Sequence, residues 1–394
     1  MTTNTPLTVL IAPDKFKGSL TAAEVITHLG SGLRARGIGY RGCPLADGGD
    51  GSVQAALHAG FQPVPVTVTG PTGGPRPAVL AYDGHTCIVE VANTCGLAAL
   101  PGGVLAPLWS SSRGLGDAVR AAVDLGADQI VLALGGSAST DGGTGMLASL
   151  GMRFLDKNGQ PLDPCGANLG RIDSIDPAGL LDLSRVQLVI ASDVQNPLTG
   201  PDGSAVVYGP QKGTTADDID TLEAGLVALV QRLRAAGYGD ADRLARTPGA
   251  GSAGGIGFAA LLLGGSLVSG AEFFLDLLDF DAQLEGCDLV ITGEGRMDGQ
   301  TRHGKLPAMV ADRARPVPVI AVVGRNDVSA SDLDALGIRA VYALTDLTDD
   351  NPADNAALSA RLLRDLGISI PLPGRVRATP GVPGCRNRAA TPTL

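Results

Sequence analysis

The sequence predicts an α/β protein in which a doubly wound domain, built from both ends of the chain, carries an inserted middle domain. Short apolar runs followed by glycine turns and helical patterns recur along the chain, which is typical of buried parallel strands with crossover helices. The first 60 residues and the C-terminal strands share this style, whereas residues 62–91 alternate like antiparallel strands, with turns at GPTGGP and YDGH. We therefore place the discontinuous domain at residues 1–70 and 281–370 and the inserted domain at 71–280.

Each expected strand is a short apolar run that ends at a glycine or a polar residue. The first strand, residues 7–12, leads to a helix that Thr21 and Glu24 begin as a capping box and that runs to about Arg36. Pro, Gly and Arg recur without periodicity at the end of the chain, so we expect residues 371–394 to form a disordered tail. The other buried strands are expected at residues 130–134, 186–192, 288–292, 317–323 and 340–344, and further helices follow Val53 and cover 117–127 and 217–236.

Composition narrows the class of protein. The chain has 394 residues, enough for two domains, and its net charge of −10 argues against a nucleic acid or an anionic membrane as a partner. No basic and then apolar leader opens the sequence, and no apolar run has the length that spans a bilayer, so we expect a cytoplasmic protein. The six cysteines lack C-x-x-C spacing and are expected to be free thiols, and the four histidines share no zinc-ligand spacing.

The stretch VLALGGSASTDGGTG, residues 131–145, is the centre of the functional argument. A buried strand breaks here into glycines, small hydroxyls and the carboxylate of Asp141, directly before a helical run. A strand end, a glycine turn and a helix N-terminus together form an anion site. The alternative is an ordinary glycine-rich turn between a strand and a helix.

Other loops place charged residues where strands are expected to end. The loop PDKFKGSL contributes Asp14, Lys15, Lys17 and Ser19, and open α/β sheets bind ligands at this edge. Asp193 directly follows an expected strand and is the first candidate for chemistry; the alternative is a turn-forming aspartate.

Aspartates also bracket a glycine pair in PLADGGDGS. Asp47 and Asp50 have a spacing that suits Mg²⁺, helix capping or a simple turn.

Two further motifs are rejected because their context is wrong. GAGSAG at residues 249–254 matches G-x-G-x-x-G, but RLARTP precedes it where a dinucleotide site needs a strand. GQTRHGK at residues 299–305 continues with Leu306, where a P-loop needs Ser or Thr.

Taken together, the loops carry Gly, Asp, Lys, Ser and Asn, and few carry His or Cys. This set suits the binding of phosphates and Mg²⁺ and the transfer of a phosphoryl group, in which positioning and charge neutralisation dominate. The residues alone predict a nucleotide-dependent kinase of a small polar metabolite and leave the acceptor open.

Seven sequence blocks, in this order, resemble the type I glycerate kinases. They are APDKFKGSLTAAE, PLADGGDGS, LGGSASTDGGTGML, SDVQNPLTG, GPQKG, PGAGSAGGIG and TGEGRMDGQTRHGK, and the resemblance runs from about residue 7 to about residue 365. It implies two α/β domains, one flavodoxin-like and discontinuous and the other inserted, with the active site between them. The implied reaction is transfer of a phosphoryl group from ATP to D-glycerate, usually giving the 2-phosphate, with Mg²⁺.

This resemblance guides a hypothesis about roles. Asp193 would deprotonate the glycerate hydroxyl and, with Asp298, would contact Mg²⁺, while Lys15 and Lys17 would neutralise phosphate or carboxylate oxygens. Nucleotide contacts are assigned to Gly135, Gly136, Ser137, Thr140, Asp141, Gly251, Gly255 and Lys305. Substrate contacts are assigned to Asp14, Ser19, Asp47, Asp50, Asn93, Asn196 and Glu294; of these, Asp47, Asp50 and Glu294 are also candidates for Mg²⁺.

Two alternatives to this function stay open at the level of sequence. One is a kinase for another small hydroxy or sugar acid, and the other is a homologue that binds ligands without turnover. The site of phosphorylation, the formation of a homodimer and the domain that binds adenine are also left open.

Overall fold

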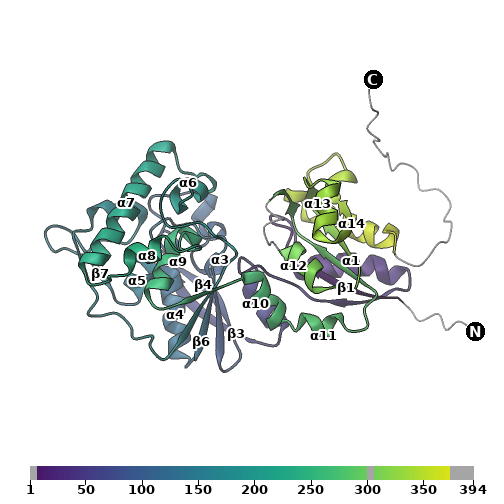
Figure 1. The fold of residues 1–394 in the computed structure, drawn as a ribbon, viewed down its shortest axis with the longest axis horizontal. Coiled ribbons are helices and arrows are strands. Elements are labelled where there is room, and N and C mark those ends of the chain that lie inside the picture. The colour runs from purple at the N-terminus through teal and green to yellow at the C-terminus, as the bar shows by residue number, and fades with distance from the viewer. Residues whose placement is uncertain (1–6, 300–305, 373–394) are drawn as a thin grey trace, which may run out of the picture.

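The computed structural model describes residues 7–299 and 306–372, which form two α/β lobes joined side by side (Figure 1). Each lobe is built on its own sheet, and the chain visits the first lobe at both of its ends. The expectation of two α/β domains, one of them discontinuous, is confirmed in this architecture.

The first lobe has a five-stranded sheet with all strands parallel. When its strands are numbered along the chain, their spatial order is 2-1-3-4-5, which is the flavodoxin-like order. The sheet reads β15 (Ile338–Ala343), β13 (Val319–Val323), β11 (Leu289–Gly293), β1 (Thr8–Pro13) and β2 (Gly39–Gly42).

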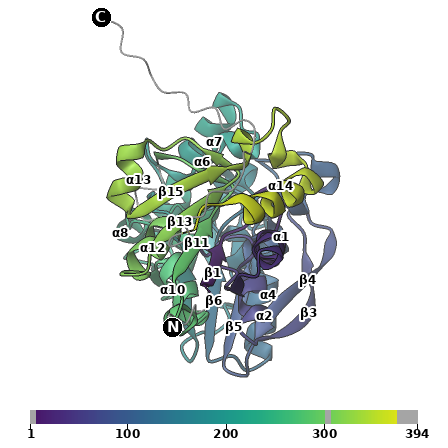
Figure 2. The ribbon, with the colours of Figure 1, turned by 90° about the vertical axis from the view of Figure 1, so that its right-hand side faces the viewer.

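Helices cover both faces of this sheet, as a buried parallel sheet requires. One face packs against α1 (Ala22–Ala35) and α14 (Ala356–Ser369), which lie side by side in Figure 2. The other face packs against α12 (Leu306–Arg313) and α13 (Ala330–Leu336). The expected capping box begins α1, because Thr21 and Glu24 each accept a hydrogen bond from the other's backbone N–H.

The second lobe has a six-stranded mixed sheet, in which β4 pairs antiparallel with both β3 and β5 and the other pairings are parallel. Its order is β10 (Ser266–Val268), β9 (Gln187–Ala191), β6 (Gln129–Ala133), β5 (Thr86–Glu90), β4 (Pro75–Tyr82) and β3 (Gln62–Thr69). Because β3 pairs with β4, the chain enters this sheet at residue 62, ahead of the boundary expected near residue 70. We therefore propose a domain crossing between α2 (Ser52–His58) and β3.

One face of the larger sheet carries most of the helices of this lobe. They are α3 (Val91–Cys95), α4 (Arg113–Asp124), α5 (Thr144–Ser149), α6 (Ser204–Tyr208), α7 (Ala216–Ala235), α8 (Ala241–Ala245) and α9 (Ser252–Leu262). Two short strand pairs lie outside the two main sheets. β12 (Arg296–Met297) pairs in parallel with β14 (Arg325–Asn326), and β7 (Arg153–Leu155) pairs antiparallel with β8 (Ser174–Asp176).

A single hydrophobic core joins the two lobes. It contains side chains of both sheets, such as Leu10 and Val290 from the first and Ile88 and Val131 from the second. Between the sheets lie α2, α10 (Gly270–Leu277) and α11 (Phe280–Leu284). This shared core fixes the ends of the strands of both sheets relative to one another.

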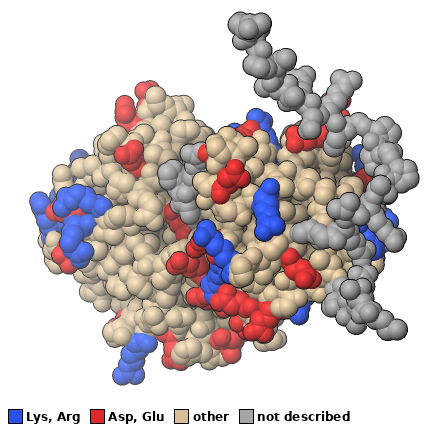
Figure 3. All heavy atoms as spheres, turned by 45° about the vertical axis from the view of Figure 1, so that its right-hand side comes forward, with Lys and Arg blue, Asp and Glu red and all other residues tan. Residues whose placement is uncertain are grey.

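The surface in Figure 3 mixes acidic and basic side chains, and the coloured part of this face carries no extended basic area. Among residues 7–299 and 306–372, no helix combines the length and the apolar character needed to cross a membrane. The expected tail falls almost entirely on residues 373–394, outside the part that the structure describes.

Candidate active site

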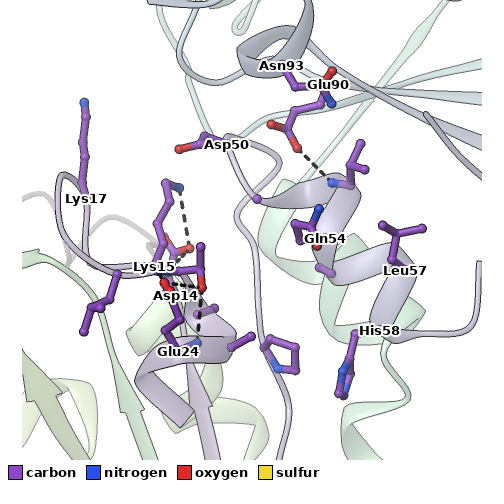
Figure 4. Close-up of a pocket in the computed structure, with 18 of the residues that line it drawn as sticks. Asp14, Lys15, Lys17, Glu24, Asp50, Gln54, Leu57, His58, Glu90 and Asn93 are labelled. Atoms are coloured by element: carbon purple, nitrogen blue, oxygen red, sulfur yellow. Dashed lines mark hydrogen bonds and ion pairs between the residues drawn. The ribbon is translucent and has the colours of Figure 1, made fainter. Parts of the chain in front are cut away.

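Two adjoining hollows lie at the carboxyl ends of strands from both sheets. The first hollow, about 820 Å³, is lined mainly by the loop after β1, by α2 and by β4 (Figure 4). The second hollow, about 880 Å³, is lined by that same loop and by the loops after β6, β11 and β13. Open α/β sheets typically bind their ligands at this edge, so the hollows lie where the sequence analysis expects the site.

The two hollows share one wall, formed by the loop after β1 together with Asp50. Asp14, Lys15, Lys17 and Ser19 all line both hollows. The backbone N–H of Asp14 donates to the Gly293 carbonyl at 2.8 Å, which fastens the start of the loop to β11. The structure thus places these four predicted side chains in one wall, and their roles stay predictions.

Lys15 carries a fixed positive charge within this wall. Its ammonium nitrogen lies 3.7 Å from Asp14 Oδ1, and the side chains of Lys15 and Asp14 are 19% and 13% exposed. Burial alone would lower the pKa of Lys15, but the nearby carboxylates Asp14, Asp47 and Asp50 outweigh burial and raise it to about 12. Lys15 is thus protonated throughout the physiological pH range.

The first hollow is also lined by the carboxylates of Asp14, Asp50 and Glu90. Burial raises the pKa of Asp14 to about 7 against the opposing charge of Lys15. Glu90 stands at the end of β5, accepts a hydrogen bond from the Val53 backbone N–H at 2.9 Å, and has its pKa raised to about 7 by burial. Figure 4 shows Asp14, Lys15, Asp50 and Glu90 around the same space, with Lys17 extending separately.

The glycine turn after β6 forms part of the second hollow. Gly135 and Gly136 both line it, and the backbone N–H of Gly135 donates to the Gly48 carbonyl at 3.3 Å. A Cβ atom on Gly135 would lie 2.4 Å from Gly49 Cα, so the loops of the two lobes meet here backbone to backbone. Gly136 has φ +77°, a conformation that favours glycine. The turn can approach a phosphate closely because it has no side chains.

The residues that follow this turn lie beneath the hollow instead of lining it. Asp141 is fully buried and accepts hydrogen bonds from Ser112 Oγ and from the N–H groups of Ser112, Gly143 and Gly145, at 2.8–3.2 Å. Ser137 and Thr140 are buried as well. The nucleotide contacts assigned to these three residues stay predictions, and the observed role of Asp141 is to hold the loop and α5.

Asp193 occupies the predicted strand end but is engaged with a helix. Its Oδ1 accepts hydrogen bonds from Ser269 Oγ at 2.8 Å and Gly270 N–H at 3.0 Å, and its Oδ2 accepts one from Ala271 N–H at 3.2 Å. These donors form the start of α10, and neither hollow includes Asp193 in its lining. Its expected roles as general base and Mg²⁺ ligand therefore stay predictions that this arrangement does not favour.

The remaining assigned residues divide by position. Asn93 lines the first hollow, though its side chain is paired with the Val79 backbone, and Glu294 and Asp298 line the second. Asn196 bonds Tyr208 and Asp202 outside both hollows. Gly251 and Gly255 pack against the backbone of neighbouring loops, and Lys305 lies outside the described residues.

The site assignments made from the sequence leave out four side chains at or under the hollows. Glu90 ends a strand just as Asp193 does, so the same rule could have identified it. Arg296 and Arg325 line the second hollow, pair in register between β12 and β14, and both contact Asp327. Lys212, from GPQKG, is buried and donates to Ser137 Oγ at 2.8 Å, so it supports the glycine loop from behind; burial lowers its pKa to about 8.

The carboxylates beside this wall suit the binding of Mg²⁺. Asp47 and Asp50 are exposed carboxylates beside the Gly135 turn, and both line the second hollow. Within the described ranges no three His, Cys, Asp or Glu side chains are grouped closely enough to hold a metal by themselves. Mg²⁺ usually needs only one or two carboxylates together with substrate phosphates, so a polyphosphate would complete such a site.

Comparisons with known proteins agree on one family. The family model described as "Glycerate kinase family" matches residues 9–369. A glycerate kinase of Bacillus subtilis is 39% identical over 92% of this chain and 98% of its own length, and a glycerate 2-kinase of Escherichia coli is 37% identical over 88% and 92%. A crystal structure of a candidate glycerate kinase 2 from Salmonella typhimurium superposes with a TM-score of 0.72 at 37% identity, over 91% of this chain and 98% of that one.

Proposed function

Because the chain belongs to the glycerate kinase family, we propose that it transfers the γ-phosphoryl group of ATP to the C2 hydroxyl of D-glycerate in the cleft between its lobes. The observation that carries this proposal is the position of Lys15 in the wall shared by the two hollows. A protonated lysine at the junction of two binding spaces can neutralise a phosphoryl group that passes between them.

The linings of the two hollows support a placement for each substrate. The second hollow has the Gly135–Gly136 turn, Lys17 and the exposed guanidinium of Arg325, which suit the oxygens of a triphosphate. The first hollow has Glu90 and Asp50, whose carboxylates can accept hydrogen bonds from glycerate hydroxyls, and Arg76, which can pair with the glycerate carboxylate.

Mg²⁺ completes the proposal, with Asp47 and Asp50 as its protein ligands. When bound, the ion would neutralise the phosphate charge that the carboxylates of this wall otherwise repel. Lys15 stays protonated between the hollows. The Gly135–Gly136 turn has no side chains, so it leaves space for the phosphates beside its backbone. A cytoplasmic location and a homodimer stay predictions.

Release of ADP upon addition of D-glycerate tests the proposal. With Mg²⁺ and ATP, we expect turnover with D-glycerate and a kcat/KM at least about 10²-fold lower for L-glycerate, tartronate or hydroxypyruvate, since buried polar groups reject analogues that leave them unpaired. A coupled assay for ADP measures each acid. Faster turnover with another acid would support a kinase of another small hydroxy or sugar acid. ATP binding without release of ADP, whichever acid is added, would support a homologue without turnover.

A further inference from the structure

We propose that Asp14, and not Asp193, is the general base that takes the proton of the glycerate hydroxyl. This inference rests on the proposed function and assigns a step within it. Three sets of observations carry the assignment: the position of Asp14 between the hollows, its free carboxylate oxygen, and the contacts, position or exposure of the competing carboxylates.

The position of Asp14 suits contact with the acceptor hydroxyl. It is the first residue after β1, it lines both hollows, and Lys15 follows it in the same wall. A base must lie within hydrogen-bond reach of the attacking hydroxyl, which itself must lie in line with the γ-phosphorus. A residue that borders both substrate spaces can meet this requirement, whereas one that borders neither cannot do so without movement.

The Asp14 carboxylate is held in place with one oxygen free. Oδ1 accepts a hydrogen bond from the Lys15 backbone N–H at 2.7 Å and lies 3.7 Å from Lys15 Nζ. Within the described part of the chain, no hydrogen bond to Oδ2 is seen. The ordered loop therefore presents a fixed carboxylate oxygen beside a fixed ammonium group.

The competing carboxylates are less suited to this step. Asp193 has both oxygens occupied by the start of α10. Glu90 lines only the first hollow and accepts the Val53 N–H. Asp47 and Asp50 are exposed on a loop, which suits a metal ligand that reaches an incoming ion; Asp14 is 13% exposed, and a desolvated carboxylate is the stronger base.

The proposed step balances in atoms and charge. The hydroxyl proton moves to Asp14 Oδ2 while the hydroxyl oxygen forms a bond to the γ-phosphorus. The bond between the γ-phosphorus and the oxygen bridging to the β-phosphate breaks, and ADP leaves with that electron pair. Asp14 then returns its proton to water as the product leaves.

The test compares Asp14→Asn with Asp193→Asn, and uses Asp128→Asn as a matched control on an exposed pair with His85. For Asp14→Asn we expect kcat to fall about 10²- to 10⁴-fold, with KM for D-glycerate and Kd for ATP within about threefold of wild type. The kcat of Asp14→Glu should be at least about tenfold higher than that of Asp14→Asn, since glutamate restores a carboxylate. We expect Asp193→Asn to keep kcat within about tenfold, and Asp128→Asn to match wild type.

Retention of ATP affinity shows that Asp14→Asn is folded. The assignment is refuted if Asp14→Asn keeps kcat within tenfold, if its loss lies wholly in KM for D-glycerate, or if Asp193→Asn loses as much kcat at unchanged KM. A wild-type protein without ADP release would refute the proposed function and the assignment with it. An active wild type with an Asp14→Asn variant whose kcat stays within tenfold of wild type would refute the assignment alone.

Discussion

Replacement of Lys15 by methionine is expected to lower kcat by roughly 10³-fold or more with D-glycerate and ATP. Methionine retains an unbranched side chain that is one atom shorter and removes its charge. The ammonium group stands between the hollows among Asp14, Asp47 and Asp50, so its loss removes the positive charge that offsets these carboxylates where the phosphoryl group passes. Steady-state kinetics at saturating substrates measures the effect.

Two further variants make this measurement specific. Lys15→Arg should also be strongly impaired, because the planar guanidinium does not fit the space of a compact ammonium group. Lys157→Met removes a lysine from an exposed turn away from both hollows and should match wild type. A Lys15→Met protein with kcat within tenfold of wild type would place phosphoryl transfer elsewhere in the molecule.

Substitution of Gly135 by alanine is expected to lower kcat/KM for ATP by about 10²-fold and to destabilise the fold by about 1–3 kcal/mol. The new Cβ would lie 2.4 Å from Gly49 Cα, a backbone atom that no side-chain rotation can move aside. The loops of the two lobes must separate, which displaces Asp50 and the Gly136 turn from each other. Kinetics and chemical denaturation measure the two effects.

Gly170→Ala is the matched control for this variant. Gly170 has open space where its Cβ would be placed, does not have a positive φ, and lines neither hollow. It should leave activity unchanged. If Gly135→Ala binds ATP and turns over as well as Gly170→Ala does, the contact between the two loops has no part in forming the nucleotide site.

The fold was predictable because its signals are local or periodic. Thr21 and Glu24 form their capping box within four residues, and apolar runs mark the buried strands almost to the residue. The sequence also predicted that Lys15, Gly136 and Asp193 share one hollow, because parallel strands bring their carboxyl ends to one edge. Lys15 and Gly136 do line the same hollow, whereas Asp193 lines neither. The domain boundary was the exception, because it was expected near residue 70. The structure places β3 in the larger sheet through its pairing with β4, which composition does not reveal.

The roles of individual carboxylates were not predictable, because their partners are distant in sequence. Asp193 is engaged by Ser269 and the start of α10, 76 residues or more away, and Asp141 accepts two hydrogen bonds from Ser112. A carboxylate at a strand end can face a ligand or satisfy a helix, and only the packed structure distinguishes these outcomes. Glu90 shows the reverse case, since it ends a strand and does line a hollow.

The central claim is that Lys15 and the Gly135–Gly136 turn join two hollows into one site where ATP phosphorylates D-glycerate. Phosphorus NMR of the product formed from D-glycerate, ATP and Mg²⁺ tests it most directly. We expect a new phosphomonoester signal, split into a doublet by the single proton at C2, that grows in step with ADP. A triplet from the two protons at C3 would exclude phosphorylation at C2. If the intact protein gave no new phosphomonoester signal, it would not be a kinase of D-glycerate.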